Sequence, residues 1–166
     1  MVLFDFSDPA ACRGWGPVDD RVMGGVSRSS LATSGSGTAI FSGTVSKENG
    51  GGFASVRSGT LVRAPASCEG VELRLLTDGK SYKVNLRTDD RFDGFQYQAR
   101  IRCDGGAWST VRIPFREFTP VLRGRPVAGV APFEPANLSG VGLMISEGQE
   151  GSFRLEIRSI TAYPKV

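Results

Sequence analysis

The sequence of 166 residues contains no histidine. Histidine is the side chain that most often moves protons near neutral pH, and it is the commonest metal ligand. Its absence excludes Ser-His-Asp and Cys-His nucleophile pairs, histidine general bases, and zinc or haem held by histidine. Carboxylate, lysine, tyrosine and cysteine chemistry stays open. We therefore expect neither a conventional hydrolase site nor a bound metal or organic cofactor.

Cysteine is also scarce, with only Cys12, Cys68 and Cys103. They are odd in number, far apart and without a Cys-x-x-Cys pair, which argues against a disulfide framework or a zinc site and for a reducing compartment. We expect each to be a small buried side chain. An enzyme that uses a cysteine thiolate or paired carboxylates is the least favoured function, because no histidine is present to lower the pKa of a thiol.

Long apolar runs are missing as well. No stretch approaches the roughly 20 apolar residues with which a helix crosses a bilayer. The first six residues lack the basic region and the apolar core of a signal peptide. The expected location is cytoplasmic, or an organellar matrix or stroma if a presequence has been removed.

Lysine is rare beside arginine, with four Lys against sixteen Arg. Basic residues exceed acidic ones by only three and are spread along the chain, so nucleic-acid binding is not indicated. Arginine binds carboxylates through a planar, bidentate group that suits protein interfaces. The excess of arginine therefore points either to partner contact or to a coding bias.

What the sequence does contain is repeated alternation of apolar and polar residues, the pattern of strands with one buried face. Such runs occur at 71–75, 82–86, 95–101, 111–115, 141–145 and 153–157, with shorter ones at 3–6, 38–42 and 53–57. Glycine and proline clusters separate them. The sequence predicts an all-β fold, a single antiparallel β-sandwich or jelly roll over residues 1–166 with roughly eight to ten strands.

The sequence also predicts how two of these strands are joined. Asp78-Gly79 is a preferred centre for a type I′ turn. A turn there pairs 71–75 with 82–86 in a hairpin, with Leu75 opposite Tyr82 and every apolar residue facing an apolar partner. The proline-rich residues 118–137 are expected to be irregular and to cross between the sheets.

Polar side chains on the central strands would share the outward face of this hairpin and its neighbour. The candidates on that face are Arg74, Lys83, Asn85, Arg87, Gln96, Gln98 and Arg100. Arginine and amide side chains can hydrogen-bond a sugar or a protein, and they equally suit an ordinary solvated sheet face.

The most unusual segment is residues 19–27, which read Asp19-Asp20-Arg21-Val22-Met23-Gly24-Gly25-Val26-Ser27. The glycine pair permits a sharp turn. One interpretation is a structural turn in which Asp20 accepts backbone N–H groups and pairs with Arg21. The other is a rigid loop that presents Arg21 and Met23 to a partner.

Two further segments are weaker candidates. The glycine run 50–52 could hold an anion with its N–H groups, although it matches no nucleotide-binding motif. Asp89, Asp90 and Asp93 could cap a turn or hold calcium, but they lack the alternating ligands and terminal glutamate of an EF-hand loop.

Several stretches follow one another in an order that is itself distinctive. They are residues 19–27, 51–57, 78–82, 86–88, 108, 113–115, 118, 120, 123–124 and 151–157. In this order they resemble the complex I intermediate-associated protein 30 domain family, whose signature usually reads Asn-Asp-x-Val-Met-Gly-Gly-x-Ser. The resemblance covers Phe4 to Tyr163. This sequence departs from it with Asp19 where Asn is commoner, and without the presequence or dinucleotide-binding domain that some members carry.

The resemblance implies a galactose-binding-like β-sandwich without catalytic residues. It also implies an assembly factor or chaperone that binds protein subunits or assembly intermediates of a respiratory or photosynthetic membrane complex. The residues that would then be either fold-defining or partner-facing are Asp20, Arg21, Met23, Ser27, Arg57, Arg87 and Arg123.

A carbohydrate-binding module is the alternative function, because sandwiches of this class often bind sugars. Sugar sites commonly stack a ring on an exposed aromatic side chain. The aromatic residues to examine are Trp15, Trp108, Tyr82 and Tyr97. Alternation places both tyrosines inward, which weakens this alternative.

Overall fold

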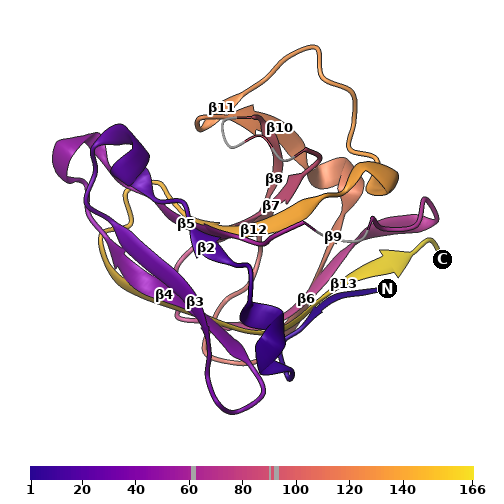
Figure 1. The fold of residues 1–166 in the computed structure, drawn as a ribbon, viewed down its shortest axis with the longest axis horizontal. Helices are drawn as coiled ribbons and strands as arrows, with labels where there is room; N and C mark the ends of the chain where they lie inside the picture. Colours follow the sequence, from indigo (N-terminus) through magenta and orange to yellow (C-terminus); the bar gives the residue numbers. More distant parts are fainter. Residues whose placement is uncertain (61–62, 90, 92–93) are drawn as a thin grey trace.

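The computed structural model describes residues 1–60, 63–89, 91 and 94–166, and these form two antiparallel sheets (Figure 1). Sheet A contains, in spatial order, β3 (Arg28–Thr33), β4 (Ala39–Val45), β13 (Gly151–Pro164), β6 (Cys68–Thr77) and β9 (Ser109–Pro114), and β1 (Val2–Asp5) also pairs with β13. Sheet B contains β11 (Arg125–Pro126), β10 (Thr119–Leu122), β8 (Gln96–Ile101), β7 (Tyr82–Arg87), β12 (Gly140–Ile145), β5 (Ala54–Arg57) and β2 (Gly16–Pro17). The predicted all-β sandwich is confirmed.

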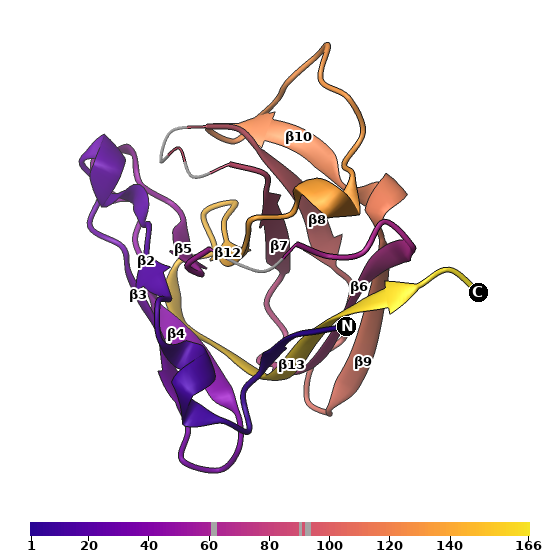
Figure 2. The ribbon, with the colours of Figure 1, turned by 45° about the vertical axis from the view of Figure 1, so that its right-hand side comes forward.

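The core forms where the apolar faces of the two sheets meet. In β12, Val141, Leu143 and Ile145 are fully buried, and in β13, Leu155 and Ile157 are fully buried. Alternate residues of a strand point to opposite faces, so each sheet can bury one face and expose the other. Figure 2 shows β1 beside the end of β13, which places the two termini close together.

The predicted hairpin between 71–75 and 82–86 is wrong. β6 lies in sheet A, where it pairs with β13 and β9, whereas β7 lies in sheet B, where it pairs with β12 and β8. Residues 78–81 therefore carry the chain from one sheet to the other. Asp78 fixes this connection, because its carboxylate accepts hydrogen bonds from the Tyr82 hydroxyl at 2.9 Å and the Arg154 N–H at 2.8 Å.

The proline-rich residues 118–137 also differ from the prediction. They contain β10 and β11, which pair at the edge of sheet B, and both ends of the stretch adjoin strands of that sheet. The crossing between sheets occurs earlier, at the short 3₁₀ helix η4 (Phe115–Glu117) between β9 and β10. Strand β3 was not predicted, since most of its residues are small and polar.

Helical structure in the described part of the chain consists of short 3₁₀ segments. Besides η4 these are η1 (Pro9–Cys12), η2 (Asp20–Met23), η3 (Glu48–Gly50) and η5 (Pro135–Asn137). None of these segments has the length or the apolar character needed to cross a membrane. All three cysteines are free thiols, but only Cys68 is buried, while Cys12 and Cys103 are half-buried.

Candidate binding face

The outward side of sheet B carries most of the predicted polar candidates, and we call it the sheet B face. Its residues are Arg57 of β5, Lys83, Asn85 and Arg87 of β7, Gln96, Gln98 and Arg100 of β8, and Met144 of β12. The strand register brings them together, because Asn85 lies opposite Gln98 and Lys83 lies opposite Arg100. Directly opposed residues of neighbouring antiparallel strands share one face of the sheet.

Arg74 does not belong to this face, which corrects the prediction. It lies in β6 of sheet A, where its Nη1 donates a hydrogen bond of 3.0 Å to the Thr110 hydroxyl on β9. The error follows directly from the wrong hairpin, which had placed β6 beside β7.

The middle of the sheet B face is uncharged. Gln98 Nε2 donates a hydrogen bond of 2.9 Å to Asn85 Oδ1 and lies 3.6 Å from Met144 Sδ. Asn85 is only 2% exposed, so its side chain is buried and is not in contact with solvent. The Gln96 side-chain oxygen is buried without a hydrogen-bond partner among the described residues.

On one side of these amides, Arg57 and Arg87 approach each other across β12. In the strand register Arg57 lies opposite Gly142 and Arg87 lies opposite Gly140, so only glycines of β12 separate them. Burial, and next the charge of Arg87, lowers the pKa of the Arg57 guanidinium below its ordinary value. Both side chains are half-buried.

On the other side of the amides, Lys83 and Arg100 share the carboxylate of Glu147. Arg100 donates to both carboxylate oxygens, with 3.3 Å from Nη1 to Oε2, and Lys83 Nζ lies 3.5 Å from Oε1. The hydrogen bond from Arg100 is the main reason that the pKa of Glu147 lies below its ordinary value, and Lys83 adds to the effect. Glu147 follows β12 and has a left-handed backbone, with φ of 64°.

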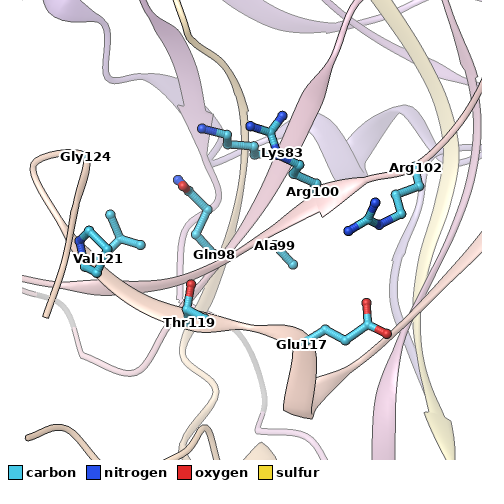
Figure 3. Close-up of a pocket in the computed structure, with 10 residues that line it drawn as sticks. Lys83, Gln98, Ala99, Arg100, Arg102, Glu117, Thr119, Val121 and Gly124 are labelled. Carbon is cyan, nitrogen blue, oxygen red and sulfur yellow. The ribbon is translucent and has the colours of Figure 1, made fainter. Parts of the chain in front are cut away.

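A groove of about 550 Å³ lies next to this ion cluster, between β8 and the β10–β11 hairpin (Figure 3). Its lining residues are Lys83, Gln98, Ala99, Arg100, Arg102, Glu117, Thr119, Val121, Gly124 and Pro126. Figure 3 shows the side chains of Arg102 and Glu117 directed toward the same end of the groove. Arg123, a predicted site residue, is exposed in the turn beside Gly124 and has φ of 50°.

The segment 19–27 contains a second polar cluster, which is internal. The Asp20 side chain is fully buried and accepts hydrogen bonds from Ser27 N at 2.9 Å, Ser27 Oγ at 2.5 Å and Gly52 N at 2.8 Å. Burial by itself would raise the pKa of Asp20, but the hydrogen bonds outweigh burial and lower it. Of the glycine run 50–52, Gly52 therefore donates its N–H to a carboxylate of the chain itself, that of Asp20.

Asp19 makes a parallel set of contacts to the two sheets. Its carboxylate accepts hydrogen bonds from Ser55 N of β5 at 3.0 Å and from Ser29 N of β3 at 3.1 Å. Since β5 belongs to sheet B and β3 to sheet A, Asp19 ties one edge of the sandwich together.

Between these buried carboxylates and Ser27, the segment turns outward. Arg21 and Met23 lie on η2 and are exposed, with Met23 at 59%. The two interpretations of the segment therefore apply to different residues. Asp20 and Ser27 form a buried support, while Arg21 and Met23 are presented to solvent.

Some residues around the face were not among the predicted candidates. Arg102 continues the alternation of Gln96, Gln98 and Arg100, so the sequence contained a signal for it. Glu117 and Glu147 lie in connecting segments with no local pattern that would place them beside the face.

Neither the calcium nor the carbohydrate alternative gains a site from the described residues. No group of three or more acidic, cysteine or histidine side chains comes together in the described ranges, and Asp90 and Asp93 lie outside them. Tyr82 and Tyr97 are buried as predicted, and Trp15 packs on Phe4 against the core, whereas Trp108 is 38% exposed beside β9 of sheet A. The residues described on the sheet B face include no aromatic side chain.

Comparison with protein families gives a match over residues 4–157 to the family described as complex I intermediate-associated protein 30. An uncharacterized protein of Schizosaccharomyces pombe is 30% identical over 99% of this chain and 84% of its own length. The mitochondrial complex I intermediate-associated protein 30 of Drosophila melanogaster is 27% identical over 94% of this chain. The chain spans 60% of the fly protein and 46% of a Caenorhabditis elegans relative that carries the same name, qualified there as probable.

Two solved structures share this fold at low sequence identity. A family 11 carbohydrate-binding module of a Clostridium thermocellum cellulase aligns with a TM-score of 0.71 at 16% identity, over 99% of this chain and 94% of the module. An exo-β-agarase aligns with a TM-score of 0.60 at 9% identity, over 99% of this chain and 25% of the agarase. At these identities the likeness establishes the fold.

Proposed function

The chain belongs to the complex I intermediate-associated protein 30 family, and on this premise we propose that it is a non-catalytic protein-binding domain. It would act as an assembly factor or chaperone that captures a subunit or an intermediate of a multisubunit membrane complex. The name of the fly relative, which associates that protein with an intermediate of complex I, supports a respiratory complex as the target. Non-catalytic action agrees with the complete absence of histidine from the sequence.

The observation that carries the proposal is the sheet B face. A hydrogen bond joins its central amides, and Glu147 pairs with both Lys83 and Arg100, so a partner would meet a partly ordered surface. Arginine is enriched at the centres of protein interfaces, and preorganised side chains lose little entropy on binding. Transient encounters of this kind usually bury a modest and partly polar area.

The compartment is part of the same proposal. The fly and nematode relatives are named as mitochondrial proteins, which supports the organellar alternative of the predicted location. Capture of a membrane-complex intermediate would then take place on the matrix side, at the surface of the membrane that holds the complex.

The test is capture of partners by the tagged chain expressed in its native organism, followed by mass spectrometry. We expect the wild-type chain to recover subunits of one membrane complex, and Arg87→Gln to recover about fivefold less, because Arg87 lies on the sheet B face. Arg74→Gln is the matched control, since it removes an arginine from sheet A and is expected to recover the same subunits as wild type. Recovery of no complex subunit by the wild-type chain would contradict the proposal.

Carbohydrate binding is the second candidate, and the shared fold of the family 11 carbohydrate-binding module is the reason to test it. The described sheet B face offers hydrogen-bonding groups but no aromatic platform on which a sugar ring could stack. A glycan array with the wild-type chain decides the matter. Selective glycan binding that Arg87→Gln abolishes would replace protein capture as the proposed function.

A further inference from the structure

The groove beside β8 has an uneven distribution of charge. Lys83, Arg100 and Arg102 line it, against one lining carboxylate, that of Glu117. Two further arginines, Arg123 and Arg125, flank Gly124 in the turn of the β10–β11 hairpin and are exposed. A concave surface lined by one sign of charge attracts groups of the opposite sign.

The groove also contains groups that can bind a peptide backbone. Gln98 and Thr119 lie opposite each other in the register of β8 and β10, and both line the groove. An amide and a hydroxyl can each donate and accept a hydrogen bond, as the N–H and C=O groups of an extended chain require. The groove therefore combines cationic groups with a neutral hydrogen-bonding strip.

Glu147 shows what the cationic end of the groove binds. Its carboxylate is held by Arg100 and Lys83, in the bidentate manner that arginine favours for carboxylates. Its side chain is 45% exposed, and Glu147 lies after β12, outside the strands of the sheet. A carboxylate of a partner could therefore replace Glu147 without any change in the strands.

The lining favours a peptide over other anionic ligands. Glu117 interrupts the cationic lining, which suits carboxylates spaced along a peptide better than the continuous phosphates of a nucleic acid. The lining residues include no aromatic side chain on which a base or a sugar could stack.

We infer that this groove is the docking site for an extended acidic peptide segment, and that Glu147, which lies beside the groove, pairs with Lys83 and Arg100 in the free chain. The inference rests on the proposed function, because it names the chemistry of the partner that the sheet B face captures. Binding would exchange one carboxylate for another at Lys83 and Arg100, while Arg102 would hold a second carboxylate of the segment.

Fluorescence anisotropy with a short labelled peptide of alternating Glu and Ser tests the inference. We expect this peptide to bind about tenfold more tightly at low salt than a peptide in which Gln replaces Glu. Glu147→Gln should tighten binding by about threefold, because the internal competitor is removed. Arg102→Gln should weaken binding by about fivefold.

Matched variants on sheet A test whether a change in peptide affinity comes from the groove residues or only from the change in net charge. Glu72 and Arg112 form an exposed ion pair there, so Glu72→Gln and Arg112→Gln change the charge of the chain by the same amounts. We expect neither control to change peptide affinity by more than about 1.5-fold. The inference would be overturned if Glu147→Gln changed peptide affinity no more than Glu72→Gln, or if Arg102→Gln changed it no more than Arg112→Gln. Equal affinity of the wild-type chain for the two peptides would also overturn it.

Other ligands and the parent proposal are tested in the same assays. Tighter binding of an RNA oligonucleotide or of anionic phospholipid vesicles than of the acidic peptide would overturn the inference. If the Arg102→Gln chain still captures complex subunits at the wild-type level, the groove is not the docking site, and the proposed function stands. If the wild-type chain captures no subunit but binds the acidic peptide with the expected pattern, the proposed function alone fails.

Discussion

The segment 19–27 and the sheet B face are both rich in charged residues, but they use charge in opposite ways. Asp19 and Asp20 are buried, and their hydrogen bonds are made within the chain. Arg100 is half exposed, and its ion pair with Glu147 lies at the surface. The two aspartates of the most distinctive motif therefore supply internal support, while a common strand alternation supplies the accessible charges of the sheet B face.

Asp20→Asn is the substitution expected to lower the free energy of unfolding most. The change keeps the size of the side chain but turns one acceptor oxygen into an N–H donor, which would face the donors of Ser27 and Gly52. We expect a loss of about 3 kcal/mol in the free energy of unfolding, because buried hydrogen bonds to a charged acceptor are lost. Urea denaturation followed by circular dichroism measures this.

Asp8→Asn is the matched control for Asp20→Asn. Asp8 is exposed and caps η1 by accepting a hydrogen bond of 3.0 Å from Ala10 N. Asparagine caps helices nearly as well as aspartate, so we expect a change below about 0.5 kcal/mol. Similar losses for both variants would mean that the buried network contributes no more than a surface cap.

The two adjacent glycines of the segment should respond differently to alanine. A Cβ on Gly25 would lie 2.5 Å from Asp20 Cγ, whereas a Cβ on Gly24 would meet no atom within 4 Å but would sit at φ of 88°. We expect Gly25→Ala to cost about 2 kcal/mol through overpacking against the carboxylate. Gly24→Ala should cost about 1 kcal/mol through backbone strain alone. Thermal unfolding of both variants gives the order, and a reversed order would contradict the role of Asp20 as a packed support.

Acid should reduce the contribution of Asp20 to the stability of the folded chain. The pKa of Asp20 is lowered in the folded chain, so its contribution to stability is complete above the unfolded pKa of about 3.9 and is lost as the pH falls through the folded pKa. The difference in stability between wild type and Asp20→Asn should therefore narrow as the pH falls below about 4. Urea denaturation from neutral pH down to pH values near 3 tests this, and a constant difference would contradict it.

The sequence predicted which side of each strand is buried but not which strands pair. Leu75 and Tyr82 are both buried as alternation required. In a sandwich, however, apolar residues meet apolar residues whether two strands form a hairpin or face each other from opposite sheets. Apolar pairing therefore could not distinguish the two arrangements, and the connection 78–81 forms the second one.

This limit explains the errors at the candidate site. The other six residues predicted for the outward face lie on the sheet B face, and only Arg74, on the wrongly paired strand, does not. Glu147 could not be found, because it meets Arg100 from 47 positions away. One interpretation of the segment 19–27 did make Asp20 an acceptor of backbone N–H groups, but it could not identify the donor Gly52, which lies 32 positions away.

The smallest expected effect belongs to Arg100→Gln on the sheet B face. The Arg100 and Glu147 side chains are 49% and 45% exposed, so water screens their attraction. We expect a loss of about 0.5 kcal/mol at low salt, and no measurable loss in about 1 M NaCl, where the screening length falls to about 3 Å.

Urea denaturation at both salt concentrations checks this expectation, with Asp20→Asn measured alongside. The Asp20 loss should persist at high salt, because its partners are buried hydrogen-bond donors. If Arg100→Gln instead cost more than about 1.5 kcal/mol at high salt, the sheet B face would be part of the stabilising framework. Its arginines would then be committed to folding in the way that Asp20 is, and they would not be available to a partner.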